Sequence, residues 1–150
     1  MKRVVITINR QYGSGGKTIG YMLAEKLGIP CYSREILQRA SEESGINESM
    51  FNARDERLKR LPKFLLSTNV YSGELLPPES KEFTSDQNLF NYEAEIIKKY
   101  AAEGSCVLIG RCADFVLKDD PDMISVYVHA DHDFQMKSAL ERVSMSEKEM

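Results

Sequence analysis

The amino-acid sequence predicts a three-layer α/β fold in which helices cover a mainly parallel sheet. Apolar, β-branched runs alternate with segments of helical period along the chain, and this alternation is typical of such folds. A glycine-rich turn also separates the first apolar run, residues 4–8, from the first helical segment. With 150 residues and 42% hydrophobic composition, the chain has the size and the core content of one globular domain, covering 1–150.

The first part of the chain predicts two pairs of a strand and a helix. After the strand at 4–8, a helix is expected over 17–27, with Gly28 as its C-cap. A short strand at 29–32 and a helix over 34–43 follow. The apolar face of this second helix holds Ile36, Leu37 and Ala40.

Regular alternation returns in the last third of the chain. A helix near 92–103 carries an apolar stripe and ends at Gly104. The next run, Cys106–Ile109, is apolar throughout, as expected for a strand buried on both faces. The remaining predicted elements are helical residues at 113–117, a strand at 124–128 and a helix near 132–143.

The segment 41–91 differs from its surroundings. A polar helical piece is expected near 47–60, and the tract from 67 to 91 contains Gly73, Pro77 and Pro78 and has no steady period. Long irregular insertions in compact domains are usually functional or mobile. We therefore predict that 41–91 is an inserted region that caps the site and binds the acceptor, and not a second domain.

Two overlapping S-x-x-E patterns lie at the end of the chain, Ser144 with Glu147 and Ser146 with Glu149. This pattern is typical of a capping box at the start of a helix. The chain ends at Met150, before such a helix could form two turns. We therefore expect a product that is truncated at its C-terminus.

The glycine-rich turn is typical of a phosphate-binding P-loop. It contains Gly13, Ser14, Gly15, Gly16, Lys17 and Thr18, between a strand and a helix. Glycines allow backbone N–H groups to surround an anion, and the helix directs its positive end at that anion. Lys17 is expected to reach the β/γ-phosphates of ATP and Thr18 to hold Mg²⁺. The match is imperfect because Gln11 stands where the pattern requires glycine, and an ordinary glycine-rich turn is the alternative.

Composition excludes several other classes of function. The formal charge of −3 argues against a general nucleic-acid binder, and no apolar run has transmembrane length. Three cysteines without a C-x-x-C pair predict reduced thiols in a cytoplasmic protein. For His129–Asp133 an aspartate N-cap, from Asp131 or Asp133, explains the sequence better than a metal site does.

The chain resembles the cytidylate kinase-like branch of the nucleoside monophosphate kinases. Three segments carry the resemblance, in this order: 8–17 (INRQYGSGGK), 30–35 (PCYSRE) and 109–111 (IGR). The resemblance implies ATP-dependent phosphoryl transfer to a nucleoside monophosphate, most simply a CMP-like acceptor. It also implies a P-loop NTPase fold with a five-stranded parallel sheet, a mobile acceptor-binding region and a lid.

Phosphoryl transfer requires cations to hold both phosphates in line. Arg111 follows a buried strand at its carboxyl end, where open α/β sheets bind ligands, and the resemblance assigns it to the acceptor phosphate. Arg34 follows the second strand, and Ser33 and Glu35 beside it are candidates for holding the acceptor or the water around Mg²⁺. Arg10 and Arg54 are weaker candidates.

Two departures from the resembled family limit what can be carried over. Cys112 stands where such kinases commonly have an aspartate that helps to recognise the base, so base specificity is left open. Lid arginines and a fifth strand are also missing, since only Arg142 lies beyond the fourth strand. We therefore expect weak turnover, and self-association through an exposed sheet edge.

Three alternatives remain. A small-metabolite kinase with a non-nucleotide acceptor would use the same fold. A nucleotide-binding module without catalysis would agree with Gln11, Cys112 and the missing lid. A GTPase is disfavoured, because the segment 107–110 supplies no acidic residue for Mg²⁺ at the end of its strand.

Overall fold

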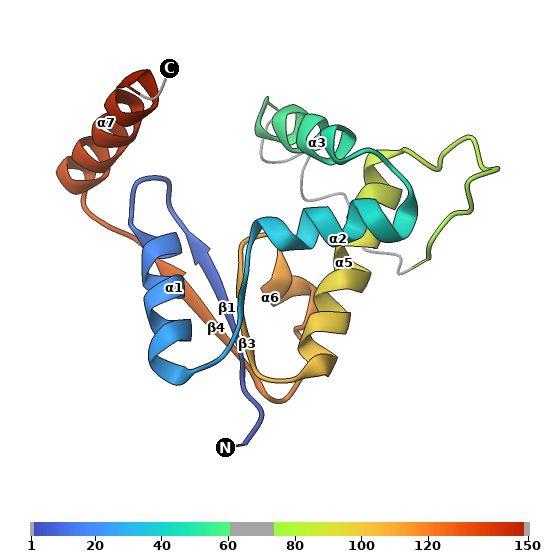
Figure 1. Ribbon diagram of the computed structural model, residues 1–150, viewed down its shortest axis with the longest axis horizontal. Helices are drawn as coiled ribbons and strands as arrows, with labels where there is room; N and C mark the ends of the chain where they lie inside the picture. Colours follow the sequence, from blue (N-terminus) through green and yellow to red (C-terminus); the bar gives the residue numbers. More distant parts are fainter. Residues whose placement is uncertain (1, 61–73, 149–150) are drawn as a thin grey trace. The chain divides into compact units, whose positions relative to one another are not determined.

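A computed structural model describes residues 2–60 and 74–148, without the side chains of 57–60 and 144–148. The chain forms two compact units (Figure 1). The first combines the N-terminal residues up to Tyr32 with the residues from Glu103 onward, and the second is Ser33–Ala102. The second unit contains the whole of the region 41–91; the cap role predicted for that region stays a prediction.

The first unit is built on a four-stranded, all-parallel sheet with the strand order β2-β3-β1-β4. This confirms the predicted α/β class. The strands are β1 (Val5–Arg10), β2 (Cys31–Tyr32), β3 (Cys106–Ile109) and β4 (Met123–Val128). Val5 aligns with Cys106 on one side and with Met123 on the other, so the carboxyl ends of β1, β3 and β4 lie at one edge of the sheet.

Three helices belong to this unit: α1 (Gly16–Leu27), α6 (Ala113–Val116) and α7 (His132–Lys148). Helix α1 packs closely on the sheet, because a Cβ at Gly20 would lie 2.9 Å from Ile109 Cδ1 and 3.1 Å from Ile8 Cδ1. Ala24 completes this buried contact. Both faces of the central strands are buried, as the apolar run of β3 predicts.

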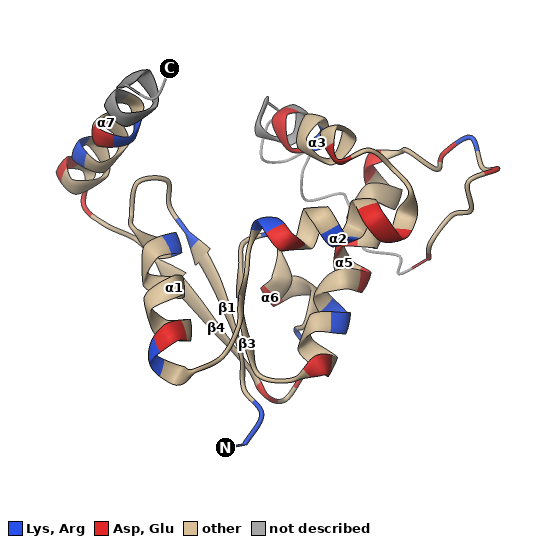
Figure 2. Cartoon of the chain, viewed as in Figure 1, with Lys and Arg blue, Asp and Glu red and all other residues tan. Residues whose placement is uncertain are grey.

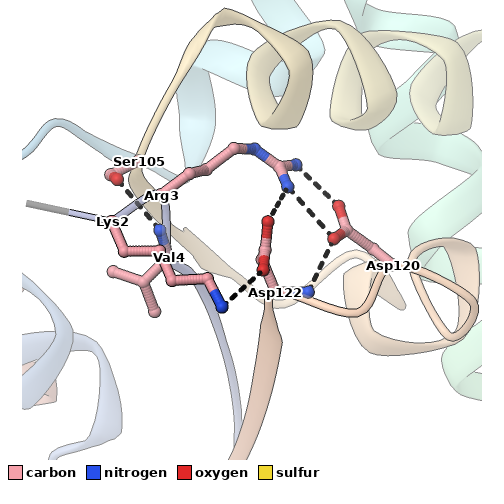
Figure 3. Close-up of polar contacts among 6 residues, drawn as sticks. All are labelled: Lys2, Arg3, Val4, Ser105, Asp120 and Asp122. Carbon is pink, nitrogen blue, oxygen red and sulfur yellow. Dashed lines mark hydrogen bonds and ion pairs between the residues drawn. The ribbon is translucent and has the colours of Figure 1, made fainter.

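Arg3 joins the amino end of β1 to the turn before β4 (Figure 3). Its Nη2 lies 2.6 Å from Asp120 Oδ2, and its Nη1 lies 3.1 Å from Asp122 Oδ2. The hydrogen bond from Arg3 holds the pKa of Asp120 below its ordinary value. Val4 N–H donates to Ser105 Oγ at 3.0 Å, and this hydrogen bond connects the residue before β3 to the residue before β1. The register of the sheet is therefore fixed at this end of the strands.

The second unit contains three described helices, α2 (Arg34–Ser44), α3 (Glu48–Arg60) and α5 (Asp86–Glu103). The predicted apolar face of α2 is confirmed, since Ile36, Leu37 and Ala40 are all buried. Ion pairs connect these helices: Lys99 of α5 binds Glu43 of α2, and Arg54 of α3 lies 3.6 Å from Glu93 Oε2 of α5.

Two predicted boundaries are wrong. Helix α5 begins at Asp86 instead of near 92, because its first turns carry buried asparagines that break the apolar stripe. Asn88 accepts a hydrogen bond from Leu76 N–H at 2.9 Å, and Asn91 Nδ2 donates to the Glu74 carbonyl at 2.7 Å. Helix α7 continues through 144–148, so the S-x-x-E patterns do not start a new helix. Residues 61–66, and the first part of the irregular tract, lie outside the described residues.

Charged residues of both signs lie on the helices of both units, whereas the strands carry almost none (Figure 2). Within the four described strands the single charged residue is Arg10, the last residue of β1. Among the residues that the structure describes, no helix combines the length and the hydrophobicity that crossing a membrane requires.

Candidate functional site

The glycine-rich loop connects β1 to α1 at the carboxyl edge of the sheet. Gly13 and Gly15 have φ of 76° and 81°, whereas Ser14 between them does not have a positive φ. Ser14 is buried, its N–H donates to the Gln11 carbonyl at 3.2 Å, and its Oγ accepts from Gly16 N–H at 3.4 Å. Glycines in this left-handed conformation permit the sharp turn that a loop around an anion requires.

The N-terminus of α1 is the end of the loop. Gly15 is its N-cap and offers no side-chain acceptor, Ser14 Oγ accepts from the first N–H of the helix, and the first turn holds no acidic residue. The first backbone bond runs from Ile19 N–H to the Gly15 carbonyl at 3.0 Å. N–H groups at such an end, together with the helix dipole, favour an anion. Lys17 and Thr18 lie in this first turn and are exposed, as the P-loop prediction requires.

Gln11, the departure from the P-loop pattern, anchors the loop. Its Oε1 accepts from Gln135 Nε2 at 2.9 Å and from Ala130 N–H at 3.3 Å. Its own N–H donates to the Val128 carbonyl at 3.0 Å. A Cβ at Gly13 would lie 2.6 Å from the Gln135 carbonyl oxygen, so the loop and α7 are in close contact. Sequence reasoning missed this role of Gln11.

A strained turn follows β3 at the same edge of the sheet. Gly110, Arg111 and Cys112 have φ of 71°, 60° and 55°, and the latter two are the non-glycine residues with positive φ in the described part of the chain. A left-handed conformation costs about 1–2 kcal/mol for a non-glycine residue. The turn is held by Gly110 N–H, which donates to the Ile8 carbonyl at 2.9 Å. Arg111 is thus placed directly after β3, as predicted, and its role in binding stays a prediction.

Three of the four residues predicted for the acceptor, Ser33, Arg34 and Glu35, begin the second unit. Ser33 is the N-cap of α2, and its N–H donates to Glu35 Oε2 at 2.9 Å. Arg34 is exposed, and its Nε lies 3.8 Å from Glu48 Oε1. These contacts are local to the start of α2 and α3. A role toward an acceptor stays a prediction for all three residues.

At His129–Asp133 the predicted aspartate N-cap is present at the start of α7, because Asp131 Oδ1 accepts from Phe134 N–H at 2.8 Å. Among the side chains that the structure describes, no group of three or more metal-ligating residues comes together. The three cysteines are thiols and form no disulfide. Burial raises the pKa of Cys106 to about 11, which makes this thiol a poor nucleophile.

The chain matches a family model described as the cytidylate kinase-like family over residues 5–150. Among solved structures it is similar to an uncharacterised protein from Eubacterium ventriosum, with 26% sequence identity and a TM-score of 0.61. The similarity covers 95% of this chain and 63% of that one, so this chain spans 63% of the length of that relative. A comparison with curated proteins finds no match. With nearly all its residues inside the matched range, the chain belongs to the cytidylate kinase-like family.

Proposed function

We propose that this chain transfers a phosphoryl group from ATP to a nucleoside monophosphate, with a CMP-like acceptor. The observation that carries the proposal is the turn between β1 and α1. Its glycines at 13 and 15 have positive φ, and the helix that follows has Lys17 and Thr18 in its first turn and no acidic residue there. Backbone amides, a helix N-terminus and a lysine are the groups that hold the phosphates of a nucleotide. Membership of a kinase-like family supports the same reaction.

Each residue then has a specific role. The loop amides and Lys17 bind the donor phosphates, and Arg111 binds the phosphate of the acceptor, one oxygen of which attacks the terminal phosphorus of ATP while ADP leaves. Ser33, Arg34 and Glu35 belong to the acceptor side, with the region 41–91 as its cap. Mg²⁺ neutralises phosphate charge and often takes only one or two protein oxygens, so the exposed Thr18 hydroxyl fits it.

An acceptor screen tests this proposal. The protein is mixed with Mg-ATP and, separately, with CMP, UMP, AMP, GMP or no acceptor, and products are separated by chromatography. We expect ADP and the diphosphate of the acceptor in equal amounts, with CMP as the acceptor that reacts fastest. If a preparation that binds ATP converts none of the acceptors to its diphosphate, phosphoryl transfer to nucleotides is contradicted.

A second candidate is a nucleotide-binding module without catalysis. The observation in its favour is Cys112, an exposed N-cap residue of α6 at a position where the resembled kinases commonly carry an aspartate. Such a module would bind ATP with ordinary affinity and form no product with any acceptor. The screen above, combined with an ATP titration, separates the two candidates.

A further inference from the structure

Arg10 crosses the carboxyl edge of the sheet from the start of α1 to the turn after β3. A Cβ at Gly16 would lie 2.6 Å from Arg10 Cβ and 3.2 Å from its Cγ and Cδ. A Cβ at Gly110 would lie 2.9 Å from Arg10 Nη1. The stem of the side chain therefore packs over one glycine and the guanidinium lies beside the other. Any larger residue at Gly16 or Gly110 would displace it.

The charges nearest to Arg10 are positive. Its pKa is lowered from the ordinary value, first by desolvation of the guanidinium and then by the positive charges of Arg111 and Arg142. Among the described residues, no carboxylate forms an ion pair with Arg10. Clustered cations repel one another, and Arg10 is exposed, so an anion from solvent can reach it. A bound anion would relieve this repulsion.

We propose that Arg10 binds the terminal phosphate of the nucleoside triphosphate, between the glycine-rich loop and Arg111; this inference rests on the proposed function. Its stem starts where the loop amides would hold the inner phosphates of the donor, and its guanidinium ends beside the residue proposed for the acceptor. The phosphoryl group in transfer must pass between these two places. A planar guanidinium is suited to grip two of its oxygens at once.

A comparison of ATP with ADP tests the assignment, because only ATP carries the terminal phosphate. Titration calorimetry with Mg-ATP and Mg-ADP is performed on the wild type, Arg10→Gln and Arg10→Lys. The control is Lys26→Gln, which removes the same charge from an exposed site at the far end of α1. For Arg10→Gln we expect about a tenfold or greater loss of ATP affinity and less than about a threefold loss for ADP. Arg10→Lys should show a smaller selective loss, and the control none.

The outcomes separate the competing explanations. Equal losses for ATP and ADP would mean that Arg10 only supports the loop, and unchanged affinities would mean that it binds no phosphate; either result overturns the assignment. If Arg10→Gln fails to fold, Arg10→Lys decides, since an unchanged ratio of ATP to ADP affinity contradicts the assignment. A wild type that binds neither nucleotide contradicts the proposed function instead.

Discussion

Gly13 satisfies two constraints at once, and its replacement should be costly. Its φ is 76°, and a Cβ would lie 2.6 Å from the Gln135 carbonyl oxygen. We predict that Gly13→Ala lowers the free energy of unfolding by about 2–4 kcal/mol, about 1–2 for the left-handed backbone and the rest for the collision. Urea unfolding measures this difference.

Gly28 provides the matched control for this substitution. Its φ is 67°, and the space where a Cβ would lie is open within 4 Å. Gly28→Ala should therefore cost only the backbone part, about 1–2 kcal/mol. Equal costs at the two glycines would contradict the close contact between the loop and α7.

Single residues were predictable where the reason is local. Gly28, and either Asp131 or Asp133, were expected at helix ends. Gly28 and Asp131 cap the helices predicted for them, because a cap depends on its immediate neighbours. The role of Gln11 was not predictable. Its side-chain partners lie 119 and 124 residues away in the sequence, and only the folded chain brings them together.

At the scale of elements, a buried ion pair connects α3 and α5. Glu93 is 1% exposed and Arg54 is 8% exposed, and Arg54 Nη1 also lies 3.6 Å from Asp55. Glu93→Gln would leave the arginine without its buried partner. We predict a loss of about 3 kcal/mol in the free energy of unfolding, at the lower end of the range for broken buried pairs because Asp55 remains.

Lys99 is the control for this prediction. It also lies on α5 and forms an ion pair with Glu43 of another helix, but its side chain is half-exposed. Lys99→Ala should cost no more than about 1 kcal/mol. If urea unfolding shows that Glu93→Gln costs no more than Lys99→Ala, the buried pair does not stabilise this unit.

The connection between β1 and β4 through Asp120 should depend on pH. The hydrogen bond from Arg3 lowers the pKa of Asp120 in the folded protein. The Asp120 carboxylate therefore contributes fully to stability above its unfolded pKa of about 4, and this contribution is lost as the pH falls through its folded pKa. We predict that Asp120→Asn costs about 1 kcal/mol at pH 7, and that its difference from wild type shrinks progressively as the pH falls below about 4.

Asp119→Asn is the control for this pH series, because Asp119 is exposed and adjacent in sequence. Urea unfolding of the three proteins from neutral pH to acid should show a pH-dependent difference for Asp120→Asn alone. A difference that stays constant into acid would mean that the Asp120 carboxylate is not the stabilising group.

Element type followed from the sequence more reliably than element length. Apolar runs and apolar periods indicated most of the described strands and helices, because a buried face imposes them. The start of α5 was missed because Asn88 and Asn91 are buried with hydrogen bonds to distant backbone groups. The S-x-x-E patterns misled because local capping competes with continuation of a helix, and α7 continues.

At the scale of the whole molecule, the alternation of strands and helices predicted a parallel sheet, but not the order of its strands. Strand order depends on crossover connections between residues far apart in sequence. The structure places β4 at one edge of the described sheet. Ile124 and Tyr127 of this strand are 52% and 61% exposed, and the strand contains no charged residue. An edge without charge or proline invites pairing with another chain.

We therefore predict that the protein self-associates through β4. Sedimentation velocity at increasing concentration should show dimers, and Tyr127→Lys should shift the population toward monomer. Met22→Lys, at an exposed apolar residue of α1, is the control and should not change it. A wild type that remains monomeric at every concentration would exclude this edge as an interface.

The central claim is that the loop between β1 and α1 binds the phosphates of a nucleoside triphosphate. Titration of Mg-ATP into wild type, Lys17→Ala and the control Lys26→Ala tests it most directly, because Lys17 lies in the first turn of α1. We predict saturable binding by wild type and by the control, and no measurable binding by Lys17→Ala in a protein that still unfolds cooperatively. Normal ATP affinity in Lys17→Ala would contradict the claim.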